Sequence, residues 1–130
     1  MTMPTMKREL TTSYDDLLVS VPEALATEGF GVLTQIDVKQ TLKKKIDVDF
    51  RRYMILGACN PALAHQALGV DIDVGVFLPC NVVIYENDDG GTVISAVDPV
   101  QAIGVFGNDA LREAAVEVRA RLARALEKVR

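Results

Sequence analysis

The stretch NVVIYENDDGGTVISAV, residues 81–97, decides the fold. Its flanks, 81–86 and 92–97, are rich in β-branched and aromatic residues, which favour β-strands. Between them lies Asp89-Gly90, and glycine readily adopts the positive φ that a tight turn between strands requires. The stretch therefore predicts a hairpin, whose strands are antiparallel. A mixed sheet fits such a hairpin better than a regular parallel α/β fold does.

Upstream of the hairpin lie several segments with strand character. The continuous apolar run YMILGAC, residues 53–59, is typical of a strand in the middle of a sheet. Weaker strand patterns occur at residues 7–12, 31–37 and 74–78. Pro79 marks a break or an edge after the last of these, because proline has no N–H to donate to a neighbouring strand.

Helices are predicted between these strands. Apolar residues spaced by threes and fours indicate helices over residues 14–28, 38–46 and 61–69. Ser13 and Asn60 precede two of them and are residue types that cap helix N-termini, and the proline after Asn60 suits a first helical turn. Helices and strands therefore alternate up to the hairpin.

The clearest helix follows the hairpin. Asn108 is expected to cap it, and apolar residues recur on one face as far as Val129. We therefore expect a two-layer α+β fold, with a mixed, mostly antiparallel sheet and helices packed mainly on one face. Residues 1–6 are expected to form a flexible N-terminus and residues 7–130 a single α+β domain.

Composition limits the classes of function. With 130 residues and 49% hydrophobic content, the chain is able to form a core without a disulfide or a metal. A net charge of −4 argues against a nucleic-acid-binding protein, which uses clustered Lys and Arg on phosphates. No apolar run is long enough to span a membrane, and the first ten residues do not resemble a signal peptide. With only two cysteines, the reducing cytoplasm is the expected compartment.

Cys59 and Cys80 are the first candidates for a site. A shared thiol site would serve as a soft-metal site, a redox pair or a nucleophile. The alternative is two buried small hydrophobic side chains, since free cysteine is among the most buried residue types. Strand direction decides whether the two thiols meet. Antiparallel neighbouring strands place both thiols at one end of the sheet, whereas parallel strands place them at opposite ends.

Four polar residues accompany the cysteines. Asn60 is well explained as a helix cap, whereas Asn81 opens a strand, where asparagine is normally depleted, so its amide needs a partner. Glu86 and Asp98 form either an acid/base or metal-binding pair with the thiols or two solvated carboxylates, and solvation is favoured. His65, the only histidine, is expected to be partly exposed and idle.

One basic cluster is present, in residues 39–52. Three aspartates nearby dilute its six cations to a net charge of +3, and a solvated helix face is the expected explanation rather than an anion site. The six cations are Lys39, Lys43, Lys44, Lys45, Arg51 and Arg52.

Four segments carry a family resemblance. They are GFGVLTQIDVKQTLKKK (29–45), LGACNPALAHQAL (56–68), LPCNVVIYE (78–86) and SAVDP (95–99). They resemble the bacterial and archaeal family called domain of unknown function 302, over nearly the whole chain. The resemblance implies a two-layer α+β fold and a homodimer, and no reaction. Met54 and His65 depart from the family pattern, whereas the matching residues are Cys59, Asn60, Pro61, Cys80, Asn81, Glu86, Asp98 and Pro99.

Two main functional hypotheses follow, and a third, a purely structural partner within a larger assembly, has less support. The first is a homodimeric ligand-binding or accessory module, because no complete catalytic constellation is present; its dimer would use a sheet edge or the last helix. The second is a thiol- or metal-dependent enzyme or redox protein using Cys59 and Cys80, helped by Asn81 and Glu86. The sequence identifies no cofactor, and the possible ligands are a small molecule or a metal. The candidate binding residues are Cys59, Asn60, Cys80, Asn81, Glu86 and Asp98.

Overall fold

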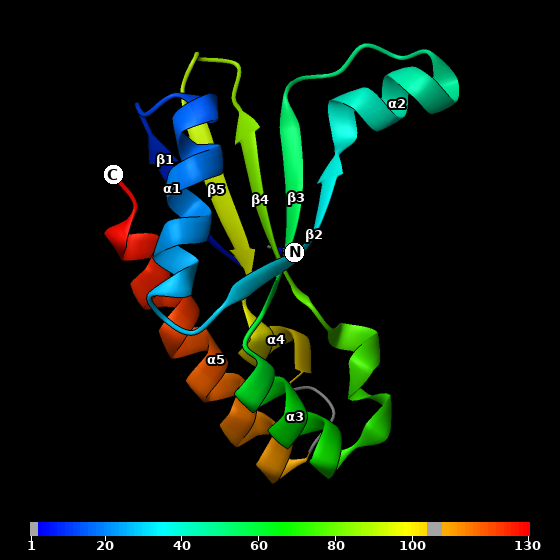
Figure 1. Cartoon of the computed structure of the whole chain (residues 1–130), viewed down its shortest axis with the longest axis vertical. Helices are drawn as coiled ribbons and strands as arrows, with labels where there is room; N and C mark the ends of the chain where they lie inside the picture. The colour runs from blue at the N-terminus through cyan, green and yellow to red at the C-terminus, as the bar shows by residue number, and fades with distance from the viewer. Residues whose placement is uncertain (1–2, 104–107) are drawn as a thin grey trace.

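The structure is a computed structural model that describes residues 3–103 and 108–130. Five strands form one sheet in the order β1-β5-β4-β3-β2, and every neighbouring pair described is antiparallel (Figure 1). The expected α+β fold and mostly antiparallel sheet are confirmed. The strands are β1 (Thr5–Leu10), β2 (Gly31–Asp37), β3 (Tyr53–Cys59), β4 (Cys80–Glu86) and β5 (Thr92–Val97).

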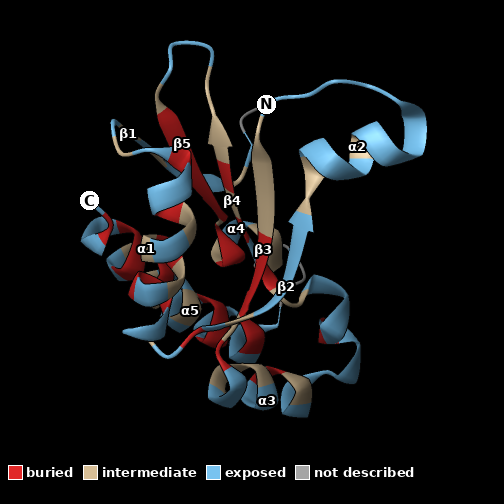
Figure 2. Ribbon diagram, turned by 45° about the horizontal axis from the view of Figure 1, so that its top comes forward, coloured by how far each residue is buried: buried red, intermediate tan, exposed pale blue. Residues whose placement is uncertain are grey.

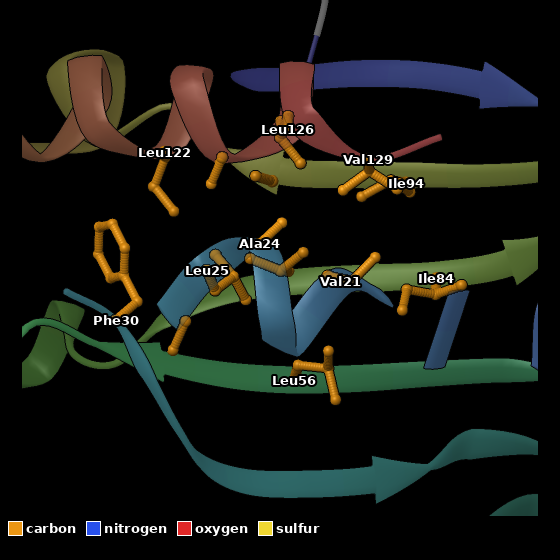
Figure 3. Close-up of a cluster of buried hydrophobic side chains, with 14 of the residues drawn as sticks. Val21, Ala24, Leu25, Phe30, Leu56, Ile84, Ile94, Leu122, Leu126 and Val129 are labelled. Carbon is orange, nitrogen blue, oxygen red and sulfur yellow. The ribbon is translucent and has the colours of Figure 1, made fainter. Parts of the chain in front are cut away.

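Two helices cover one face of this sheet, α1 (Tyr14–Ala26) and α5 (Asp109–Lys128). Their apolar side chains pack on the alternate residues of β3, β4 and β5 that point toward them, as the close-up in Figure 3 shows. A fully buried leucine in such a core contributes roughly 1.5–3 kcal/mol. The largest fully buried side chains include Leu17, Leu25, Leu56, Ile84, Ile94 and Leu122.

The N-terminal part follows the sequence expectations closely. The Ser13 side chain accepts a hydrogen bond from the Asp16 N–H and begins α1. After α1, Gly29 adopts a φ of +84°, a left-handed conformation that glycine adopts without strain, and Phe30 turns back into the core. β1 begins at Thr5, two residues before the expected start, so Thr5 and Met6 of the expected flexible terminus belong to the sheet, whereas Met3 and Pro4 lie outside the strand.

The β4–β5 hairpin forms as expected. Gly90 has a φ of +84°, and the Asn87 side chain accepts hydrogen bonds from the N–H groups of Asp89 and Gly91. This amide oxygen holds the turn closed, which fixes the register of the two strands.

One predicted strand is wrong. Residues 74–77 belong to a 3-10 helix, η1 (Ile72–Phe77), which follows α3 (Pro61–Val70), and Leu78 is the extended residue after it. The Asp71 side chain accepts a hydrogen bond from the Asp73 N–H and begins η1. Only Val74 of this apolar run is buried, so the run does not lie within the sheet. A short apolar run suits a strand and a buried turn of helix equally well.

One helix was not predicted, α4 (Pro99–Ile103), which follows β5 directly. Asp98 caps it by accepting hydrogen bonds from the N–H groups of Val100 and Gln101. The signal was available, because Asp98-Pro99 has the same cap-then-proline pattern as Asn60-Pro61.

The segment from β2 to β3 projects from the body as an arm. It contains α2 (Val38–Ile46), none of whose residues is buried, and it reaches beyond the end of the sheet (Figures 1 and 2). The Asp37 side chain caps α2, and the Lys39 Nζ donates to the carbonyl of Phe50, which ties the two ends of the arm together. The basic cluster is therefore largely a solvated helix face, as expected.

Candidate functional site

Strand direction brings the two cysteines to the same end of the sheet. β3 and β4 are antiparallel neighbours, Cys59 ends β3 and Cys80 begins β4. The residue directly opposite Cys80 is Ala58, so the two cysteines are not cross-strand partners. Cross-strand partners have the closest side chains in a sheet, and the two sulfurs lack that placement.

The Cys80 thiol is buried against the helices. Its side chain belongs to the core cluster and is 9% exposed. Burial raises the pKa of the Cys80 thiol to about 11, and the nearby Cys59 thiol raises it further. At neutral pH almost no thiolate exists at a pKa this high, and thiolate is the nucleophilic and metal-binding form. This environment does not favour a nucleophilic or redox role for Cys80.

The same register places Asp98 near the cysteines and Glu86 far from them. Val82 is opposite Ala96, so extending the pairing by two residues brings Asp98 level with Cys80. Glu86 lies six residues along β4 from Cys80, which is roughly 20 Å in an extended strand. Five of the six sequence candidates therefore meet at one end of the sheet, and Glu86 is at the other.

Asn60 has the structural role that the sequence favoured. Its side-chain oxygen accepts a hydrogen bond from the Leu63 N–H and begins α3, while its amide nitrogen donates to the Glu28 carbonyl. Asn60 is 7% exposed, and these two bonds occupy both ends of its amide. Asn60 therefore links the start of α3 to Glu28, in the turn that follows α1, and fixes the position of α3 at this end of the sheet.

Asp98 is a buried carboxylate that joins three elements. Besides capping α4, it accepts a hydrogen bond from the Gln101 side chain and forms a 2.9 Å ion pair with the Arg119 Nε of α5. Its side chain is 4% exposed. All of these partners belong to the chain itself, so Asp98 holds α4 and α5 in place rather than presenting a free carboxylate.

Glu86 is half of a clamp at the opposite end. Both of its oxygens accept 3.0 Å hydrogen bonds from Arg52, which also binds Asp15 and lies over the Tyr14 ring. The hydrogen bonds from Arg52 lower the pKa of Glu86. This clamp joins the residue before β3 to β4 and α1, and the solvated carboxylate expected from the sequence is instead a structural ion pair.

A cavity of about 40 Å³ lies at the cysteine end of the sheet. Cys59 and Cys80 form part of its wall, and α3, η1, α4 and α5 close it from the helical side. A space of this size exceeds what a single water needs, yet the lining offers few polar partners to hold one. The apolar lining includes Phe30, Ala64, Ala67, Val74, Leu78, Ile103, Leu111, Ala114, Ala115 and Val118.

An open hollow of about 270 Å³ adjoins this cavity. Leu78, Cys80, Pro99 and Ile103 line both spaces, so Cys80 lies at their junction. Asn81 lines the hollow and is exposed, and its side chain makes no hydrogen bond to the described part of the chain. Apolar pockets with a few placed polar groups are typical of small-molecule sites.

Sequence reasoning found the polar residues of this end but not the cavity. The small wall residues are Ala64 and Ala67 of α3 and Ala114 and Ala115 of α5, and the two pairs of alanines are more than forty residues apart in the chain. Nothing in the pattern of either helix indicates which alanines face each other. His65 is exposed on α3 and is not part of the cavity wall, as expected.

Two further observations concern the described residues. Within residues 3–103 and 108–130, no group of three or more His, Cys, Asp or Glu side chains is placed to hold a metal ion. Among the described helices, none combines the length and apolar character that crossing a membrane requires.

Comparison with known proteins agrees with the fold. The family model described as "Domain of unknown function DUF302" matches residues 6–129. The crystal structure of an uncharacterized conserved protein DUF302 from Bacillus stearothermophilus superposes with a TM-score of 0.92 at 35% sequence identity, covering 99% of this chain and 100% of that one. Among curated proteins, none matches significantly.

Proposed function

This chain belongs to the DUF302 family, and we propose that it is a small homodimeric module that binds a ligand with a short apolar chain and a polar head. The observation that carries the proposal is the junction of two spaces at Cys80. An apolar cavity lies on one side of this residue, and an open hollow containing the free amide of Asn81 lies on the other.

The chemistry of the two spaces defines the ligand class. The cavity excludes charge, because its wall is apolar and its one buried thiol stays protonated at neutral pH. The hollow is open to water, so a hydroxyl or a similar neutral polar group keeps its hydration there and gains a hydrogen bond to Asn81. The chain's net charge of −4 supports a small ligand over a nucleic acid, and its two free cysteines suit the cytoplasm.

The thiol- or metal-dependent alternative has less support. It needs Cys80 as thiolate and Glu86 nearby, whereas the pKa of Cys80 is raised and Glu86 is bound to Arg52 at the other end of the sheet. The ligand-binding proposal needs neither.

Titration with primary alcohols from ethanol to hexanol, followed by the amide shifts of the ¹⁵N-labelled protein, tests the proposal. Each added methylene is expected to tighten binding roughly fourfold until the chain fills the cavity. The saturable shifts are expected in α3, η1 and the first half of α5. Shifts that are absent, or that rise linearly over the whole protein, would contradict the proposal.

Two variants of α3 provide a matched pair. Ala64→Leu places three extra carbons at the cavity wall and is expected to weaken hexanol binding at least about tenfold. Ala62→Leu makes the same change on the exposed side of α3 and is expected to leave binding unchanged. Asn81→Ala, at an exposed position, is expected to weaken binding roughly three- to tenfold without affecting folding. Equal affinities for all three variants would place the ligand elsewhere.

A further inference from the structure

The two edges of the sheet differ in their protection. β1 (TMKREL) carries Lys7, Arg8 and Glu9, and charged side chains on an edge strand discourage pairing with another chain. The first six residues of β2 (GVLTQI) carry no charge and no proline. Leu33 and Ile36 of β2 are 66% and 47% exposed. In the part of the chain that the structure describes, β2 pairs with β3 alone, so its other side is open for backbone hydrogen bonds.

Exposed apolar residues continue beyond both ends of β2. At its C-terminal end, the arm exposes Ile46 and Val48. At its N-terminal end, Gly31 pairs with Cys59, after which α3 and η1 follow, and η1 exposes Ile72 and Val76 at 79% and 82%. The arm and η1 project on the same side of the molecule, at opposite ends (Figure 1).

These two surfaces have opposite charge. The arm, residues 37–52, contains six cations and three aspartates. Residues 53–111 contain no Lys or Arg at all. Asp71, just before η1, and Asp73, within it, lie on either side of Ile72 in the sequence. A basic apolar surface at one end of an open strand and an acidic apolar surface at the other form a self-complementary pair.

We propose that two copies of this chain associate by antiparallel pairing of β2 with β2 across a two-fold axis. This arrangement joins the two sheets into one and brings the arm of each copy onto η1 of the other, so both apolar surfaces are buried and the opposite charges meet. The inference rests on the homodimer part of the proposed function and is independent of the cavity.

Sedimentation velocity of the full chain and of matched edge variants tests the arrangement. Leu33→Lys introduces a charge on the β2 edge and is expected to raise the dimer dissociation constant more than about tenfold. Thr5→Lys makes a similar change on the β1 edge and is expected to leave the dimer dissociation constant unchanged. Circular dichroism of each variant establishes that it is folded. A native dimer that both variants leave intact would overturn this interface and keep the homodimer, whereas a native monomer would overturn both.

Charge reversal tests the contact between the arm and η1. Lys44→Glu and Asp73→Lys are each expected to raise the dissociation constant roughly three- to tenfold, and the double variant is expected to restore affinity. Neither side chain is buried, so folding should not be affected. If the double variant is weaker than both single variants, the contact is wrong. If the native chain is monomeric and its arm instead binds vesicles of phosphatidylserine, a lipid surface is the partner and the inference fails.

Discussion

The two ends of the sheet are built from similar residue types and have different properties. At one end, Asp98 binds Arg119; at the other, Glu86 binds Arg52. The Asp98 side chain is 4% exposed and the pair stands beside an apolar cavity, whereas the side chains of Glu86 and Arg52 are each 39% exposed. The comparison shows that a carboxylate and an arginine do not define a site. What distinguishes the cysteine end is the space enclosed beside the polar residues.

Replacing the carboxylate by alanine at each end should give the largest difference in the free energy of unfolding. Asp98→Ala removes the buried carboxylate that caps α4 and pairs with Arg119, and it leaves two part-buried N–H groups without this partner, so it is expected to lower the free energy of unfolding by about 2–4 kcal/mol. Glu86→Ala is expected to cost about 1 kcal/mol or less, because its ion pair is partly hydrated and Arg52 keeps Asp15. Urea denaturation of both variants measures this. Equal losses would mean that the two ends do not differ in burial as described.

Alkaline pH should act on the cysteine end of the sheet through Cys80. A thiol whose pKa is about 11 when folded and 9.0 ordinarily binds its proton more tightly in the folded state, so stability is lost as pH rises above about 9. Between pH 9 and 10.5, the native protein is expected to lose about 1–2 kcal/mol more than Cys80→Ala does. Tyr14 and Tyr53, whose pKa values are also raised by burial, titrate equally in both proteins.

Cys59→Ala serves as the control for this experiment, because Cys59 lies at the same end of the sheet outside the core cluster. It is expected to keep most of the alkaline loss of the native protein, because burial is the larger cause of the raised Cys80 pKa and Cys59 the smaller one. A Cys80→Ala variant with the full native loss would mean that the thiol is not buried in solution.

At the Arg52–Glu86 end, acid pH should have the smallest of these effects. Arg52 lowers the pKa of Glu86, so the pair contributes stability above the ordinary glutamate pKa and loses it as pH falls through the lowered value. Glu86→Gln is therefore expected to flatten the dependence of stability on pH slightly between about pH 4.5 and 3. Thermal unfolding at several pH values measures the slope, and a steeper slope in Glu86→Gln would contradict the ion pair.

Local patterns predicted most of the elements because caps and turns act over a few residues. Ser13, Asn60 and Asn108 each accept a hydrogen bond from an N–H three residues on, as their positions indicated. The prediction of a strand at residues 74–78 was wrong because an apolar pentapeptide is too short to show a periodicity that distinguishes a strand from a turn of helix. Asp98-Pro99 carries the same local signal, a cap followed by proline, at the start of α4.

The candidate site was predicted only in part because it depends on strand register. From the sequence, Cys59 and Cys80 were candidates that antiparallel strands would bring to one end of the sheet. The antiparallel pairing of β3 and β4 confirms that placement. Glu86 also matches the family motif and lies at a strand terminus, but this is the opposite terminus of β4 from Cys80. The cavity depends on contacts between α3 and α5, and no local pattern predicts such contacts.

A crystal structure of the protein soaked in hexanol tests the central claim most directly. The proposed function predicts that the alkyl chain occupies the cavity between α3, η1 and α5 and that the hydroxyl lies beside Asn81. Cys80 would then lie between the alkyl chain and the hydroxyl. An empty cavity, with hexanol only on the protein surface or at the Arg52–Glu86 end, would contradict it.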